Sequence, residues 1–213
     1  MTPLRDVEAA LAARLATTLP GPDALRRFAP RPPRGNWDPS DIPATARPAA
    51  ALLLLYPHDG DAHVLLTERH SDLPHHPGQI SLPGGRLDAN ETLQAAALRE
   101  AREEVGVRPD EVRILGRLSP VFVFVSNFAI HPFVGVTDER PSFARAPREV
   151  ESLIEVPLAH LRDPARLRWG TRTREGYLID FPYFDLADRQ VWGATAIILG
   201  EFACLFDEGF GKR

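Results

Sequence analysis

Residues 85–107 read Gly-Arg-Leu-Asp-Ala-Asn-Glu-Thr-Leu-Gln-Ala-Ala-Ala-Leu-Arg-Glu-Ala-Arg-Glu-Glu-Val-Gly-Val, the most informative segment of the sequence. Its periodicity predicts a helix over residues 91–105. Asn90 is a suitable N-cap, and Gly106 supplies a C-terminal stop. One face of this helix carries side chains that can pack on a sheet: Ala97, Leu98, Ala101 and Val105.

Three carboxylates share another face of the predicted helix. At about 100° per residue, Glu100, Glu103 and Glu104 fall within an arc of roughly 100°. Like charges at this spacing repel one another, and Arg99 and Arg102 offset only part of that repulsion. Taken alone, the cluster is also compatible with a solvated charged face. A bound divalent cation would offset the repulsion better, and Mg²⁺ and Mn²⁺ prefer carboxylate oxygens.

Such a cluster suits the hydrolysis of a diphosphate. A metal held by Glu100 and Glu104 could neutralise the diphosphate, orient it and acidify a bound water, while a third carboxylate acts as general base. Gly84 and Gly85 precede the helix, and backbone without side chains can approach a metal or a phosphate closely.

The same stretch resembles the Nudix box. The pattern of this box is Gly-x5-Glu-x7-Arg-Glu-U-x-Glu-Glu-x-Gly-U, where x is any residue and U is a small or aliphatic residue. Every defined position is filled, by Gly85, Glu91, Arg99, Glu100, Ala101, Glu103, Glu104, Gly106 and Val107. The resemblance implies an α+β fold, an α/β/α sandwich with a mixed β-sheet between helices. It also implies a Nudix diphosphatase that uses Mg²⁺ or Mn²⁺.

The resemblance also assigns roles. The implied metal ligands are Glu100, Glu103, Glu104 and the backbone of Gly85, and the implied catalytic residues are Glu103, Glu104 and Arg99. Arg99 would orient a glutamate, and Glu91 would be a structural or outer partner. The general base varies among Nudix enzymes. Glu104 is one candidate here, and Glu149 is another, although the sequence favours surface charge as the role of Glu149.

The segment before the box bears on the substrate. Residues 65–85 resemble the signature of the Nudix coenzyme A diphosphatases, a Leu-Leu-Thr-x-Arg strand followed by a Gly-Gln loop and Phe-Pro-Gly-Gly. Residues 191–196 resemble the Trp-Gly-x-Thr-Ala segment of the same subfamily. The chain departs from the pattern at His70, Pro74 and Leu82, where serine or alanine, arginine and phenylalanine are usual.

Several residues around this segment are candidates for substrate binding: Arg69, Gln79, Ser81, Gly84 and Arg86. Arg69 could instead pair with a carboxylate. Gln79 and Ser81 could instead brace the loop. The adjacent histidines His75 and His76 are expected to be solvated, because Mg²⁺ prefers oxygen ligands. Two aromatic residues that could stack on adenine are expected to pack in the core instead, Trp192 and Phe184.

The rest of the chain predicts two regions. Residues 1–48 comprise a helix over residues 4–19 and a proline-rich connector over residues 28–48. The arginines in or near this connector, Arg26, Arg27, Arg31 and Arg34, are expected to be solvated, with contact to an anionic ligand as the alternative. Residues 49–213 form the Nudix domain. It is expected to hold a hairpin of strands at 50–56 and 63–67, strands at 112–125, 128–136, 149–161 (ending in a short helix) and 177–184, and a helix at 195–205.

Composition sets the remaining limits. The net charge of −4 offers no basic surface for nucleic acid or membranes. The lone cysteine, Cys204, is expected to be a small buried side chain. A cytoplasmic enzyme is the default expectation, because the N-terminus has no apolar core of signal-peptide length. The sequence leaves open whether the chain forms a homodimer.

The predicted reaction is cleavage of coenzyme A, and of its acyl form, into adenosine 3′,5′-bisphosphate and 4′-phosphopantetheine. The alternatives are a Nudix hydrolase for ADP-ribose, a dinucleotide or a nucleoside triphosphate, and a Nudix module that binds a nucleotide without cleaving it. The complete set of glutamates argues against the binding module.

Overall fold

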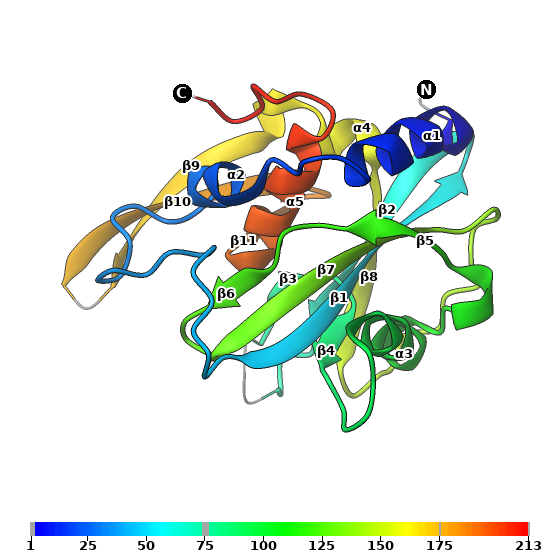
Figure 1. The fold of residues 1–213 in the computed structure, drawn as a ribbon, viewed down its shortest axis with the longest axis horizontal. Coiled ribbons are helices and arrows are strands. Elements are labelled where there is room, and N and C mark those ends of the chain that lie inside the picture. Colours follow the sequence, from blue (N-terminus) through cyan, green and yellow to red (C-terminus); the bar gives the residue numbers. More distant parts are fainter. Residues whose placement is uncertain (1–2, 74–76, 175, 213) are drawn as a thin grey trace.

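A mixed sheet organises the computed structural model, which describes residues 3–73, 77–174 and 176–212 (Figure 1). In this part of the chain, the central path runs β3–β2–β1–β7–β5, with β4 also paired to β1, β6 to β7 and β8 to β2. Strands β1 and β7 are parallel, whereas the other pairs are antiparallel. The strands are β1 Arg47–His58, β2 Asp61–Arg69, β3 Ile80–Ser81, β4 Gly84–Arg86, β5 Arg113–Arg117, β6 Val121–Val123, β7 Phe128–Val136 and β8 Val150–Pro157.

Helices lie on both sides of this sheet, as expected for the α+β sandwich (Figure 1). Helix α3 (Leu93–Val105) covers one face, and the other side carries α1 (Leu4–Leu15), α2 (Gly21–Arg27), α4 (Leu158–Leu161) and α5 (Ala194–Cys204). A small antiparallel sheet consists of β9 (Leu167–Arg174), β10 (Tyr177–Leu186) and β11 (Arg189–Trp192). Two 3₁₀ turns, Pro109–Glu111 and Pro164–Arg166, complete the described elements.

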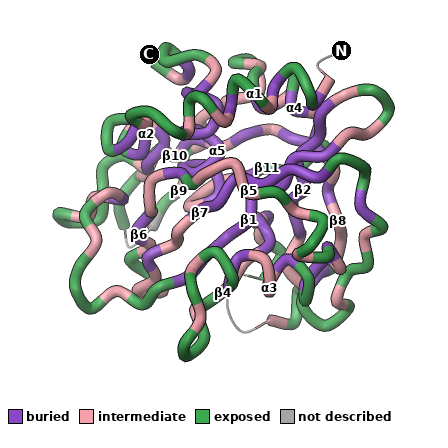
Figure 2. The backbone as a smooth tube through the Cα atoms, turned by 45° about the vertical axis from the view of Figure 1, so that its right-hand side comes forward, coloured by how far each residue is buried: buried purple, intermediate pink, exposed green. Residues whose placement is uncertain are grey.

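Strand β1 separates two hydrophobic cores because successive side chains of a strand point to opposite faces. Leu52 and Leu54 pack with Ala97 and Ala101 of α3. Leu53 belongs to the larger core on the other side, together with residues of α1, α2 and α5. Figure 2 shows that the central strands are buried along most of their length. The continuous apolar run of β1 therefore reflects burial on both faces.

The hairpin of β1 and β2 forms as predicted, with Leu55 opposite Val64. Its turn residues Asp59 and Gly60 have φ values of 50° and 83°, the conformation of a tight two-residue hairpin turn. The predicted strand over residues 149–161 with a short helix at its end is also confirmed, by β8 and α4. The final helix, predicted over residues 195–205, corresponds to α5.

Other predictions of local structure were wrong. Thr92, not Asn90, caps α3, since its hydroxyl accepts from the N–H of Ala95 at 3.2 Å, whereas Asn90 has a φ of 63°. The predicted helix over residues 4–19 stops at Leu15, and α2 follows it. The predicted strand over residues 112–125 is divided into β5 and β6, because the N–H of Ser119 between them donates to Glu201 instead of a neighbouring strand. Strands β3, β4, β9 and β11 were not predicted.

Arg26, Arg31 and Arg34 are exposed, as expected, whereas Arg27 is partly buried, and all four also make specific contacts. Arg26 pairs with Asp38, Nε to Oδ2, at 2.6 Å. Arg27 donates to the carbonyl of Phe210 at 2.6 Å. The guanidinium groups of the other two lie over aromatic rings, Arg31 at 5.0 Å from Trp169 and Arg34 at 5.2 Å from Phe124.

The N-terminal region packs on the same core as the rest of the chain. Leu11, Leu25 and Phe28 are each 1% exposed, and the Phe28 ring lies 6.4 Å from that of Phe184. The division at residue 48 stays a prediction, but these contacts give residues 4–28 a structural role. Cys204 is buried as expected, and burial raises the pKa of its thiol to about 11.

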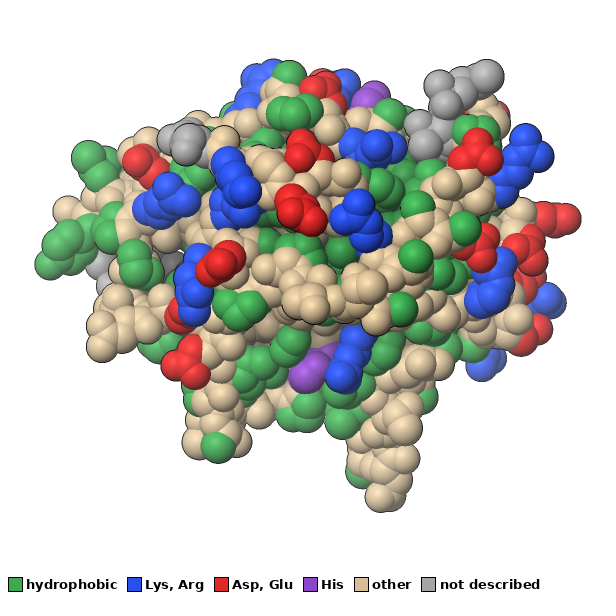
Figure 3. All heavy atoms as spheres, turned by 45° about the horizontal axis from the view of Figure 1, so that its top comes forward, with side chains coloured by type: hydrophobic (Ala, Val, Ile, Leu, Met, Phe, Trp, Pro, Cys, Tyr) green, Lys and Arg blue, Asp and Glu red, His purple; other side chains and the backbone are tan. Residues whose placement is uncertain are grey.

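The surface on the side of α1 and α2 shows acidic and basic side chains intermingled (Figure 3). This mixture agrees with the modest net charge of −4. Among the described residues, no helix combines the length and apolar character needed to cross a membrane.

The buried carboxylate of Glu201 ties three segments together. It accepts hydrogen bonds from the N–H of Gly21 at 2.9 Å and from the N–H and hydroxyl of Ser119 at 2.9 and 2.6 Å. The side chain is completely buried, and burial raises the pKa of Glu201 above its ordinary value of 4.5. The start of α2, the segment between β5 and β6, and α5 therefore meet at one ionisable group.

Substituting Glu201→Gln should destabilise the fold by about 1–3 kcal/mol, because the amide nitrogen cannot accept from Ser119. A raised pKa means that the folded state holds the proton more tightly than the unfolded state. The stability advantage of the wild type over the variant should therefore shrink as the pH rises above 4.5. Urea unfolding between pH 4.5 and 7.5 measures this difference. The exposed Glu208→Gln is the control, and an advantage that grows with pH would contradict the prediction.

Candidate active site

Helix α3 presents its glutamates to the sheet edge because its ends and its packing face are fixed. Thr92 begins the helix, and Gly106 ends it with a φ of 75°, a left-handed conformation that suits glycine. Ala97 and Ala101 are buried against β1. This packing also buries Glu104, of which only 4% is exposed.

Strand β4 brings the glycine pair against this helix. Gly84 and Gly85 pair with Ala51 and Ala50 of β1. The N–H of Gly84 donates to Oε2 of Glu104 at 3.2 Å. A Cβ added to Gly85 would collide with the carboxylate of Glu100. Backbone and carboxylates therefore approach each other with no room for a side chain between them.

Arg99 holds the glutamates on the outer side of the helix. Its Nε and Nη2 donate to the two carboxylate oxygens of Glu91 at 3.0 and 3.1 Å. Nη1 donates to Glu100 at 2.9 Å and to Glu103 at 3.0 Å. The hydrogen bonds from Arg99 lower the pKa of Glu91. Arg99 thus positions the carboxylates, with Glu91 as its main partner.

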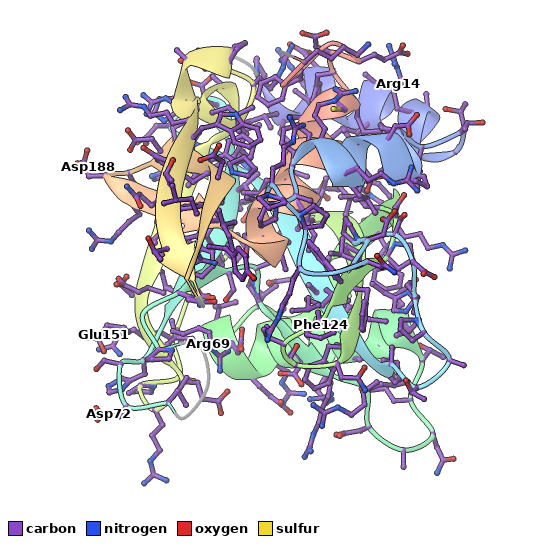
Figure 4. All side chains as sticks on the ribbon, turned by 90° about the vertical axis from the view of Figure 1, so that its left-hand side faces the viewer. Arg14, Arg69, Asp72, Phe124, Glu151 and Asp188 are labelled. Atoms are coloured by element: carbon purple, nitrogen blue, oxygen red, sulfur yellow. The ribbon has the colours of Figure 1, made fainter. Side chains whose placement is uncertain are left out.

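A cleft of about 660 Å³ opens beside these groups. It is lined by eight residues predicted from the sequence, Arg69, Gln79, Ser81, Gly84, Gly85, Arg86, Glu100 and Glu104. Figure 4 shows Arg69 between α3 below and the small sheet above. Nε of Arg69 is buried and has no hydrogen-bond partner among the described residues.

Two predicted residues do not line this cleft. The carboxylate of Glu103 is paired with Arg99, and its side chain is 57% exposed. Arg99 itself lies behind the carboxylates. Over the described ranges, no three carboxylate, imidazole or thiol groups converge on one point. Glu103 stays a predicted ligand, whereas Glu100 and Glu104 share the cleft.

Glu149 also lines the cleft, although the sequence favoured a surface role for it. The segment before it covers the C-terminal end of α3, where the N–H of Ala146 donates to the carbonyl of Glu104 at 2.8 Å. The N–H of His70 donates to the carbonyl of Glu149 at 2.9 Å. Arg47 of β1 lines the cleft too and was not predicted, because nothing in its sequence context distinguishes it.

Other candidates have defined partners. The Ser81 hydroxyl lies 3.1 Å from that of Thr67, which favours bracing of the loop. Phe184 is fully buried as expected, whereas Trp192 is only partly buried and lines the cleft. Leu82 packs in the larger core. Pro74, His75 and His76 lie outside the described residues.

Burial disfavours the ionised form of the carboxylates in the cleft. The pKa of Glu104 is raised to about 8, mainly by burial, with Glu100 and Glu149 also raising it and the Gly84 N–H and Arg69 opposing the rise. A shift from 4.5 to about 8 corresponds to about 5 kcal/mol against the ionised form. Burial also raises the pKa of Glu100. A cation between these two groups would relieve the cost.

The donor set fits a hard divalent cation. Mg²⁺ commonly binds one or two carboxylates, keeps several waters and takes its remaining oxygens from substrate phosphates. Two carboxylates and arginine side chains in one cleft match that pattern. Fold and site together define a class of protein, a hydrolase for phosphate-containing substrates.

Comparisons with known proteins identify the family. The NUDIX domain profile matches residues 45–175. The chain is 34% identical over 182 residues to "Uncharacterized Nudix hydrolase NudL" of Enterobacter sp. (strain 638), covering 85% of this chain and 92% of the relative. It is 30% identical over 203 residues to "Nudix hydrolase 3" of Caenorhabditis elegans, covering 82% and 84%. Among solved structures, the crystal structure of RenU, a Nudix hydrolase from M. smegmatis, superposes on this chain with a TM-score of 0.47. The two are 27% identical, and the match covers 54% of this chain and 73% of that one.

The chain therefore belongs to the Nudix hydrolase family. It is an enzyme that hydrolyses a phosphate-containing anhydride, and enzymes of this family generally use divalent metals such as Mg²⁺ or Mn²⁺.

Substituting Arg99→Lys should destabilise the protein by about 2 kcal/mol, because one ammonium cannot replace the forked contacts to Glu91 and Glu100. For a chain of this size, that loss corresponds to a fall in Tm of roughly 4–8 °C. Thermal unfolding checks it, with the exposed Arg102→Lys on the same helix as control. Equal Tm values for the two variants would contradict the role given to Arg99.

Proposed function

We propose that the protein hydrolyses the diphosphate of coenzyme A to adenosine 3′,5′-bisphosphate and 4′-phosphopantetheine. The observation that carries this proposal is the single cleft that joins Glu100 and Glu104 to Arg69, Gln79 and Arg86. The carboxylates belong to the Nudix box, and Arg69 and Gln79 belong to the segment that resembles the coenzyme A diphosphatases. Reaction chemistry and substrate recognition thus meet at one place.

The metal site we propose consists of Glu100 and Glu104, with the backbone of Gly85 beside them and Glu103 as a further ligand on release from Arg99. When bound there, Mg²⁺ or Mn²⁺ neutralises diphosphate charge and acidifies a bound water. The missing side chain at Gly85 lets the carboxylate of Glu100 approach the backbone closely.

The remaining residues would bind the substrate and handle the proton. Arg69 precedes the glycine pair in the sequence, and Arg86 follows it. Both arginines line the cleft and would bind phosphate oxygens. Glu104 and Glu149 are the two candidates for the general base, because both line the cleft. Arg99 positions Glu100 through its hydrogen bond of 2.9 Å. A cytoplasmic location and a homodimer stay predictions.

The substrate is tested by incubating the protein with Mg²⁺ or Mn²⁺ and a panel of coenzyme A, ADP-ribose, NADH and nucleoside triphosphates. Chromatography should show adenosine 3′,5′-bisphosphate and 4′-phosphopantetheine as the products from coenzyme A. The kcat/KM for coenzyme A should be higher than that for any other substrate of the panel. Cleavage of ADP-ribose with coenzyme A left intact would show that the substrate is wrong.

Substituting Glu104→Gln should lower kcat by at least about 100-fold, because it removes a carboxylate at the proposed metal site. The amide oxygen can still accept from the N–H of Gly84, so the fold should be retained. Steady-state kinetics and circular dichroism measure the two effects, with Glu111→Gln as a matched control outside the cleft. A kcat within a few fold of the wild-type value would show that Glu104 is not part of the metal site.

A further inference from the structure

We infer that Arg47 is a specificity-determining residue, which binds the phosphate at the 3′ position of the substrate ribose. This inference rests on the function proposed above and concerns a residue that neither the Nudix box nor the segment before it contains. The 3′-phosphate takes no part in the cleavage. A group that binds it can therefore select the substrate without touching the reacting atoms.

Arg47 lies at the start of β1, in the same cleft as the carboxylates but some distance from them. Further along the strand, Ala50 pairs with Gly85, whose backbone adjoins the carboxylate of Glu100. At about 3.3 Å per residue, the backbone of Arg47 lies roughly 10 Å along β1 from this pair. One ribose separates the 3′-phosphate from the diphosphate, and a ribose together with an arginine side chain can bridge that distance.

The guanidinium of Arg47 is held in place without being buried. It lies 4.2 Å from the centroid of the Phe128 ring, and its Nη2 donates to the carbonyl of Ser126 at 2.8 Å. The backbone N–H of Arg47 donates to the carbonyl of Asn127 at 2.8 Å, so the same turn also fixes the start of the strand. These contacts use one face and one nitrogen of the guanidinium, and the residue as a whole is exposed.

The charge of Arg47 is not neutralised by a carboxylate in the part of the chain that the structure describes, since its contacts there are a carbonyl and an aromatic ring. Arg99, in contrast, is paired with Glu91, Glu100 and Glu103. The planar fork of a guanidinium matches two oxygens of a phosphate. Position, orientation and charge thus suit Arg47 to a phosphate other than the one that is cleaved.

Arg86 is the other exposed arginine of the cleft, but it lies at the diphosphate end. It follows the glycine pair directly, and its carbonyl accepts from Nη2 of Arg99 at 3.1 Å. Arg86 is therefore assigned to the diphosphate and Arg47 to the 3′-phosphate. The two arginines should respond differently to removal of that phosphate.

The test compares kcat/KM for coenzyme A and for 3′-dephospho-coenzyme A, which differ only in this phosphate. The wild type should favour coenzyme A by at least about tenfold, mainly through KM, because the phosphate is bound alike before and during the reaction. Arg47→Gln should bring the two values within about threefold of each other, because a charge-assisted contact is lost. Arg47→Lys should give an intermediate ratio, since it retains the charge but not the fork.

Two other variants serve as controls. Arg86→Gln should lower kcat/KM for both substrates by the same factor, because both contain the diphosphate. Arg117→Gln should leave both values unchanged, since Arg117 is an exposed arginine of β5 that does not line the cleft. A merely structural role of Arg47 would lower both values alike and leave their ratio as in the wild type.

Failure of the inference is distinct from failure of the proposed function. If coenzyme A is cleaved but the wild type does not distinguish the two substrates, the inference alone is overturned. The same holds if Arg47→Gln keeps the wild-type ratio, or if Arg86→Gln abolishes the preference in its place. If coenzyme A is not cleaved, the proposed function fails and the inference fails with it.

Discussion

The structure depends on the contact between strand β4 and helix α3. At this contact, the backbone of Gly84 and Gly85 lies directly against the carboxylates of Glu104 and Glu100. A side chain at Gly84 would collide with the backbone of Ala50 and Ala51, so β4 could no longer pair closely with β1. One steric constraint therefore fixes the sheet edge and the position of the acidic groups together.

Electrostatics oppose this arrangement, and the fold maintains it through packing. Repulsion between like charges on an exposed helix costs only a few tenths of a kcal/mol. Burial of Glu104 is the larger effect, with a pKa raised to about 8. Ala97 and Ala101 hold α3 on β1 in spite of that cost. Arg99 stabilises Glu91, Glu100 and Glu103 from outside the cleft, whereas burial disfavours the ionised form of Glu104.

The sequence predicted the features that depend on local patterns and missed those that depend on distant contacts. The hairpin turn at Asp59 and Gly60 and the end of α3 at Gly106 follow from backbone preferences of those residues. The carboxylates of Glu100 and Glu104 share a cleft as helical geometry required. Glu103 lies within the same arc of the helix, yet Arg99 holds it outside, and helical periodicity carries no information on that choice.

Long-range contacts explain the remaining differences. Glu149 reaches the cleft because the loop before it covers the end of α3, some forty residues away in the chain. Composition alone made residues 28–48 resemble a solvated linker. In the structure, Arg31 pairs with β10 and Trp37 with β6, so the segment becomes a wall between two sheets. Proline suits this position, since it needs no hydrogen-bond partner for a backbone N–H and presents an apolar ring.

The connector lines an apolar cleft that adjoins the charged cleft of the active site. The Nudix box and the loop before it provide charge, which fits a diphosphate of any kind. The connector and the turn at Phe124 provide apolar surface in an adjoining cleft. Because these two surfaces come from different parts of the chain, specificity can change without disturbing the contact between β4 and α3. A substitution in residues 30–37 can therefore alter the apolar surface while the acidic cleft keeps its geometry.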